Sequence, residues 1–256
     1  MSTATRPRDP DLDHVRWHDL ECGGYDADLP LWRELAAAAP GVAAGDARVL
    51  DLGAGTGRVA LWLAAAGHPV LGADVDPVFC AELRRRAGVR DVPASAVVSD
   101  ARELRLAERF PLVLAPMQTV QLLGGAAARE AMLVGIREHL TPGGVAAIAI
   151  VEDVEPFDVA DAEAVAPDMR DHDGTVYASR PVGVTVADGQ IVLDRIREIV
   201  EPSGERHVSS DRTVLDVLDA DTLEDEARHA GLRVLPRRAI GATDDHVGSQ
   251  VVMLGA

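Results

Sequence analysis

The chain has 256 residues, a length that suits one large α/β domain with insertions. Hydrophobic residues make up 47% and charged residues 26% of it, a globular composition that excludes extended disorder. No apolar run reaches about 18 residues, so we expect no membrane-spanning helix and no membrane partner. The opening residues are charged and contain prolines where a signal peptide needs an apolar stretch, so we expect a soluble, cytoplasmic protein.

The charged residues are strongly unbalanced. All 25 cations are arginine, and 42 acidic residues bring the formal net charge to −17. A nucleic-acid partner requires a basic surface, so this balance disfavours one. The lack of lysine excludes Schiff-base chemistry, and the two cysteines, Cys22 and Cys80, have no metal or redox spacing. Arginine in place of lysine, together with many alanines, indicates a GC-rich bacterial genome.

Helix signals dominate the first forty residues. Residues 1–10 are predicted to be a flexible tail, and residues 14–22 a short helix. Asp28 is the predicted N-cap of a second helix, which Pro40-Gly41 ends. We assign residues 11–44 to a helical N-terminal cap.

From Arg48 onward, short apolar strands alternate with helices. The expected strands are 48–52, 69–74, 95–100, 110–116 and 145–152, and the expected helices are 57–67, 76–88 and 126–140. Strands that are apolar throughout, separated by crossover helices, predict a parallel sheet covered on both faces. Two final strands at 232–240 and 249–254 complete a doubly wound, mostly parallel seven-stranded sheet in a domain spanning 45–256.

A different pattern follows Glu152. An acidic, irregular stretch leads to three β-rich runs at 175–187, 190–200 and 207–218, which are separated by hairpin signals. We therefore predict an antiparallel β-subdomain inserted at about 172–218. Asp221 is then expected to cap a helix that ends near His229.

The strongest motif is VLDLGAGTGR at residues 49–58. A buried strand carries Asp51, a turn follows through Gly53, Gly55 and Gly57, and a helix begins at once. Glycines let backbone amides approach a ligand closely, and the helix start favours an anionic group. Asp74 ends the next strand, where a carboxylate can accept both hydroxyls of a ribose. The combination predicts an adenosine-containing cofactor.

The glycine spacing distinguishes between such cofactors. A dinucleotide fingerprint would require glycine at position 58, which is Arg58, so NAD and FAD are disfavoured. The spacing D-x-G-x-G-x-G resembles the first motif of the class I S-adenosylmethionine-dependent methyltransferases, and the resemblance runs from about His18 to the C-terminus. It implies a Rossmann-like methyltransferase fold and S-adenosyl-L-methionine as cofactor.

Further segments resemble the same family. Asp100-Ala101 matches its adenine contact, APMQTVQLL the segment that lines the methyl-donor pocket, and WHDLECGGYDAD an N-terminal cap over the cofactor. His18-Asp19 stands where Tyr-Asp is usual, which leaves open whether His18 contacts the methionine carboxylate. The resemblance implies cofactor contacts from Tyr25, Asp51, Gly53, Ala54, Gly55, Gly57, Asp74, Val75, Asp100, Ala101, Pro116, Gln118 and Gln121.

Acceptor chemistry is less defined by the sequence. An amine needs only to arrive deprotonated, whereas an alcohol, phenol or carbon nucleophile gains from a general base. The candidate bases are His18, His172, Tyr177, His207 and His246, and no spacing selects among them. Acidic clusters surround His172 and His246, but adjacent residues rarely point at one ion, so we expect no metal.

The late insert resembles additions in the small-molecule branch of the family, such as sugar N,N-dimethyltransferases and glycine N-methyltransferase-like enzymes. This implies methyl transfer to a small-molecule acceptor by in-line displacement. Such inserts roof the substrate pocket or form a dimer contact, so a homodimer is a further expectation. Two alternatives stay open: a methyltransferase-like protein that holds cofactor without turnover, and a protein or nucleic-acid methyltransferase.

Overall fold

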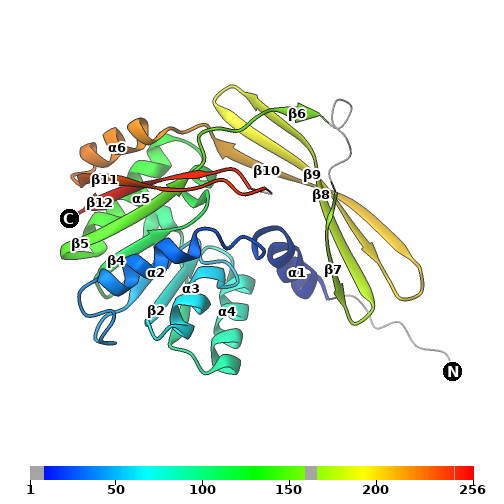
Figure 1. The fold of residues 1–256 in the computed structure, drawn as a ribbon, viewed down its shortest axis with the longest axis horizontal. Coiled ribbons are helices and arrows are strands. Elements are labelled where there is room, and N and C mark those ends of the chain that lie inside the picture. Colours follow the sequence, from blue (N-terminus) through cyan, green and yellow to red (C-terminus); the bar gives the residue numbers. More distant parts are fainter. Residues whose placement is uncertain (1–8, 159–165, 245) are drawn as a thin grey trace.

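The larger of two β-sheets has the order β11-β12-β5-β4-β1-β2-β3 in the computed structural model, which describes residues 9–158, 166–244 and 246–256 (Figure 1). Neighbouring strands from β1 to β5 pair in parallel, whereas β12 is antiparallel to both β5 and β11. This confirms the predicted doubly wound, mostly parallel seven-stranded sheet. Its strands are β1 (Val49–Leu52), β2 (Val70–Asp74), β3 (Ala94–Val98), β4 (Phe110–Ala115), β5 (Leu140–Ile150), β11 (Arg233–Ile240) and β12 (Ser249–Gly255).

Helices cover both faces of this sheet (Figure 1). One apolar core lies beneath α2 (Leu29–Ala38), α3 (Arg58–Ala65) and α4 (Pro77–Arg90). A second core lies beneath α5 (Ala126–His139) and α6 (Ala220–His229). Because β1 and β4 are buried on both sides, their residues are apolar almost throughout. Chain order reverses between these two strands, and ligands of such sheets bind beyond the strand ends at that point.

The second sheet is antiparallel and has the order β10-β9-β8-β6, with β7 also paired to β8. Its strands are β6 (Phe157–Asp158), β7 (Asp168–His172), β8 (Thr175–Ala187), β9 (Gln190–Val200) and β10 (Arg206–Asp216). Strand β7 corrects the expectation of an irregular stretch before Thr175. It carries mostly exposed polar side chains, so it shows none of the alternation that marks a strand in the sequence.

Helix α1 (Pro10–Cys22) lies between the two sheets (Figure 1). Its Trp17 and Leu20 form a small apolar cluster with Tyr177 of β8 and Ile199 of β9. The helix begins four residues before the expected His14, because Asp9 caps it and Pro10 fits its first turn. Residues 1–8 of the predicted tail lie outside the described part of the chain.

Three other local expectations are corrected. The Asp28 side chain makes no capping hydrogen bond to α2 and instead binds Arg58. Asp219 caps α6, accepting from the Thr222 amide at 2.6 Å, so Asp221 lies within the first turn. Strand β5 begins at Leu140, five residues before the expected start at position 145. Among the described residues, no helix is both long enough and apolar enough to cross a membrane.

Candidate active site

The glycine loop joins β1 to α3. Gly53, Gly55 and Gly57 have φ angles of +68°, +53° and +99°, a region that favours glycine. The amides of Gly53 and Ala54 both donate to the Ala73 carbonyl, at 2.8 and 3.2 Å, and so tie the loop to β2. A Cβ atom on Gly53 would lie 2.6 Å from the Thr119 side chain, and one on Gly55 would lie 2.5 Å from the His18 ring. The loop therefore has no room for a side chain at Gly53 or Gly55.

Asp74, at the end of β2, supports this loop directly. One carboxylate oxygen accepts from the Gly55 amide at 2.8 Å and the other from the Asp76 amide at 2.9 Å. Each carboxylate oxygen has a second lone pair, so Asp74 can still accept from a ligand hydroxyl. Val75, the next residue, is 65% exposed and presents an apolar side chain beside this acid.

Asp51 lies within β1, next to the loop. It is 1% exposed, and neither carboxylate oxygen has a hydrogen-bond partner among the described residues. Burial raises the pKa of Asp51 to about 7, against a smaller opposing effect of Arg58. A buried carboxyl without a partner is costly, and a cationic ligand group would compensate it.

Arg58, the first residue of α3, fixes the segment that carries Tyr25. It pairs with both carboxylate oxygens of Asp28 at 2.6 Å and donates to the Tyr25 carbonyl at 2.7 Å. Its guanidinium also lies over the Tyr25 ring, with the guanidinium carbon 5.3 Å from the ring centre. Tyr25 is buried, and the His246 ring lies 4.9 Å from it between ring centres.

The predicted pair His18-Asp19 lies on α1 against the glycine loop. His18 packs on Phe79 at 4.4 Å between ring centres, and burial lowers the His18 pKa. Burial by itself would raise the pKa of Asp19, but hydrogen bonds from Arg86 and Thr56 lower it below its usual value. The Thr56 hydroxyl donates to Asp19 at 2.7 Å, so the pair anchors the cap helix on the loop.

The remaining cofactor candidates occupy two turns, one after β3 and one after β4. Asp100 caps the short 3-10 helix η1 (Ala101–Glu103) and pairs with Arg102. Pro116 and Gln118 follow β4 and lead into η2 (Thr119–Leu123). Gln121 differs from the others: its buried amide group donates to the carbonyls of Val151 and Asp216 and accepts from the Val151 amide. The Gln121 side chain therefore links Val151, which follows β5, to Asp216, the last residue of β10.

The candidate bases are not brought together, and His207 lies apart on β10. Tyr177 is 1% exposed, donates to Asp13 and accepts from Arg16 at 2.8 Å, so it holds α1 on β8. His172 lies beside it, with 5.6 Å between ring centres, and burial lowers the His172 pKa. His18 and His246 lie near the cofactor loop and Tyr25, respectively.

Three residues of this site were not among the predicted site residues. Arg58 and Asp28 form its buried ion pair, and Thr119 packs against Gly53. Arg58 directly follows the last glycine of the motif, which is the one local signal for it. Asp28 and Thr119 carry no such signal because their contacts join segments far apart in the chain.

Comparisons with known proteins agree with this geometry. Residues 49–144 match the family model of a methyltransferase domain. This segment of the chain is therefore similar to a methyltransferase domain. The match runs from β1 into β5, so it contains the glycine loop, Asp74 and the Asp100 turn, and it leaves out α1 and the antiparallel sheet.

Two curated relatives resemble part of the chain. A cypemycin N-terminal methyltransferase from Streptomyces sp is 36% identical over 107 residues, which are 42% of this chain and 43% of the relative. An S-adenosyl-L-methionine-dependent Diels-Alderase, iccD, from Talaromyces variabilis is 34% identical over 106 residues, 41% of this chain and 36% of the relative. The chain therefore spans less than half the length of each of these relatives.

Solved structures resemble the methyltransferase domain together with its additions. The sugar N-methyltransferase KedS8 from Streptoalloteichus sp aligns with a TM-score of 0.70 at 16% identity, covering 98% of this chain and 96% of that one. CcbJ methyltransferase from Streptomyces caelestis aligns at 0.67 and 22% identity, covering 91% of each chain. These likenesses support the fold of the described part of the chain.

Proposed function

We propose that this chain transfers a methyl group from S-adenosyl-L-methionine to a small-molecule acceptor. The observation that carries the proposal is the glycine loop at the end of β1, with Asp74 hydrogen-bonded to the Gly55 amide. The cofactor supplies an activated methyl group when bound. The chain then has to bind and orient both reactants and exclude water.

The residues around the loop fit this cofactor. Asp74 retains lone pairs for ribose hydroxyls, and Val75 offers an apolar surface to the adenine. The unpartnered buried carboxyl of Asp51 suits the positive charge of the methionine part. The same end of the sheet carries the two turns that follow β3 and β4. We assign Asp100 and Ala101 to the adenine side of the cofactor. We assign Pro116 and Gln118 to the methyl-donor side.

An amine is the acceptor that we favour. Two of the similar proteins are named as a sugar N-methyltransferase and an N-terminal methyltransferase. An amine that arrives deprotonated needs no general base from the protein. The candidate bases lie apart from one another, which agrees with an amine acceptor. We assign the antiparallel sheet to acceptor binding. The expected cytoplasmic location, the homodimer and the lack of nucleic-acid partners remain predictions.

A second function is favoured by one specific comparison. The relative from Talaromyces variabilis is named as an S-adenosyl-L-methionine-dependent Diels-Alderase, so a similar domain can use this cofactor in another reaction. Incubation with labelled S-adenosyl-L-methionine and a panel of amino sugars and peptides separates the two functions. Label transfer to an amine supports the proposal. Tight cofactor binding without transfer to any acceptor supports the second function.

A further inference from the structure

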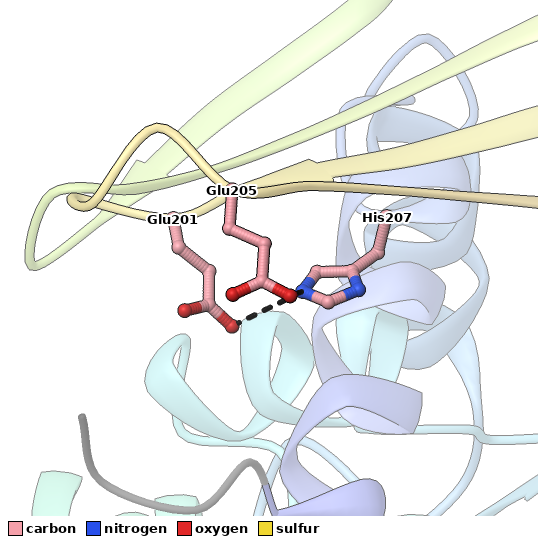
Figure 2. Close-up of side chains that lie close together, drawn as sticks. All are labelled: Glu201, Glu205 and His207. Atoms are coloured by element: carbon pink, nitrogen blue, oxygen red, sulfur yellow. Dashed lines mark ion pairs between the residues drawn. The ribbon is translucent and has the colours of Figure 1, made fainter.

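A histidine and two glutamates converge at the end of the β9–β10 hairpin. Glu201 follows β9, Glu205 precedes β10, and His207 is the second residue of β10 (Figure 2). One potential ligand atom from each residue lies within 4.8 Å of the other two. None of the three belongs to the cofactor loop, and the proposed function does not use them.

The hairpin backbone brings these side chains to one face. His207 is directly opposite Ile199, and side chains alternate along a strand, so Glu201 and Glu205 continue the same face. The turn is closed by hydrogen bonds from the Glu201 amide to the Glu205 carbonyl and from the Gly204 amide to the Glu201 carbonyl, at 2.9 and 2.8 Å. The three ligands are therefore held by backbone pairing.

Their polar atoms are poorly satisfied without a ligand. The His207 Nε2 atom is buried and has no hydrogen-bond partner among the described residues. The Glu201 side chain is only 10% exposed, and His207 is its one ion-pair contact in the described part of the chain. A buried imidazole nitrogen that lacks a hydrogen bond costs free energy.

The spacing of these atoms is that of a metal site. His207 Nε2 lies 3.3 Å from a Glu201 oxygen and 3.6 Å from a Glu205 oxygen. Two ligands that each lie about 2.0 Å from a tetrahedral zinc ion are separated by about 3.3 Å. Calcium needs about six to eight oxygen ligands and magnesium keeps an octahedral shell rich in water, so one imidazole and two carboxylates suit neither ion as well.

We propose that Glu201, Glu205 and His207 bind a divalent transition-metal ion of the zinc type, with water completing its coordination. The ion would join the end of β9 to the start of β10. Because it binds folded protein, it would stabilise the antiparallel sheet. The site differs from the clusters around His172 and His246 that the sequence brought to notice, and it departs from the expectation of no metal.

Calorimetric titration of the full chain with zinc chloride tests this site, with magnesium chloride as the comparison. We expect one zinc ion to bind with micromolar or tighter affinity and magnesium to bind far more weakly. His207→Ala and Glu201→Gln should each lower zinc affinity at least tenfold. His229→Ala, which removes an exposed histidine on α6, should leave zinc affinity unchanged.

Two further readouts separate a lost site from a damaged fold. Zinc should raise the unfolding temperature of the wild type but not that of His207→Ala, while both metal-free proteins unfold cooperatively. Cobalt(II) should give absorption bands of nitrogen and oxygen coordination that His207→Ala abolishes. Absence of zinc binding, or equal binding by wild type and His207→Ala, overturns the proposal. Zinc binding that is retained in both His207→Ala and Glu201→Gln would place the ion elsewhere on the chain and would also overturn the proposal.

Discussion

The carboxylate of Asp74 accepts a hydrogen bond of 2.8 Å from the Gly55 amide. The acid that ends β2 therefore holds the loop that follows β1, and both belong to the proposed cofactor site. The same carboxylate can accept ribose hydroxyls through its remaining lone pairs. Loop shape and cofactor binding thus depend on one side chain.

Replacing Asp74 should weaken cofactor binding sharply. Asp74→Ala removes the charged acceptor for the ribose and one support of the loop. Hydrogen bonds to charged groups contribute about 1.5–3 kcal/mol each, so we expect at least a tenfold loss of S-adenosylhomocysteine affinity by calorimetry. Asp225→Asn, an exposed acid on α6, is the matched control. Unchanged affinity in Asp74→Ala would contradict the assignment of this acid.

Gly55 should tolerate no side chain. Its φ angle of +53° disfavours other residues, and an added Cβ would lie 2.5 Å from the His18 ring. Gly55→Val should abolish S-adenosylhomocysteine binding. Gly55→Ala should weaken it, and adding His18→Ala should recover part of the loss because the clash is removed while the backbone strain remains. A double variant that binds no better than Gly55→Ala would show that His18 is not the obstacle.

Asp51 predicts an unusual pH dependence of stability. Its pKa is raised from 3.8 to about 7, so between these values the folded protein holds a proton that the unfolded chain has lost. Stability contributed by this group therefore falls as pH rises from about 4 to about 7, by at most roughly 4 kcal/mol. Asp51→Asn removes the cost of ionising a buried carboxyl. The variant's free energy of unfolding should therefore exceed that of the wild type by more at pH 8 than at pH 5.

Urea unfolding of ligand-free wild type and Asp51→Asn at both pH values checks this expectation. Asp225→Asn, which changes an exposed acid, should show no such pH-dependent difference. A gain in Asp51→Asn that is equal at pH 5 and pH 8 would mean that Asp51 ionises normally in the fold.

The ion pair between Asp28 and Arg58 should be essential for folding. Their side chains are 1% and 11% exposed, and the Trp32 indole also donates to Asp28 at 2.8 Å. Asp28→Ala leaves a buried arginine without its partner, which costs about 3–5 kcal/mol. The exposed pair Arg212–Asp194 provides the control, because Asp194→Ala should cost less than about 1 kcal/mol. Chemical unfolding measures both variants, and an equal loss of unfolding free energy in Asp28→Ala and Asp194→Ala would contradict this account.

Tyr177 should matter for stability and not for proton transfer. Its hydroxyl is buried between Asp13 and Arg16, so Tyr177→Phe leaves buried polar atoms short of a partner and costs about 1–3 kcal/mol. We expect the pH profile of kcat to remain unchanged at saturating acceptor. A large loss of kcat, with a shifted pH profile, would instead make Tyr177 the base.

The parallel sheet and the cofactor loop could be predicted because their signals are local. Apolar strands, the spacing of Gly53, Gly55 and Gly57, and an acid at the end of β2 all appear within short segments. The tertiary contacts could not be predicted in the same way. Asp28 and Arg58 are 30 positions apart, and each has an ordinary local interpretation, as a helix cap and as a solvated arginine.

Strand β7 and the role of Gln121 escaped prediction for related reasons. The β7 residues are polar and mostly exposed, so pairing with β8 alone makes them a strand. Gln121 follows a strand end where the family resemblance implies a cofactor contact. In the structure its amide bonds to Val151 and Asp216, which lie 30 and 95 positions away.

Calorimetric binding of S-adenosylhomocysteine to the full chain, with NAD as the comparison ligand, tests the central claim most directly. We predict micromolar binding of S-adenosylhomocysteine and no response to NAD, because Arg58 occupies the position where a dinucleotide fingerprint needs glycine. Folded protein that binds NAD, or that fails to bind S-adenosylhomocysteine, would contradict the proposed cofactor and the methyl transfer that depends on it.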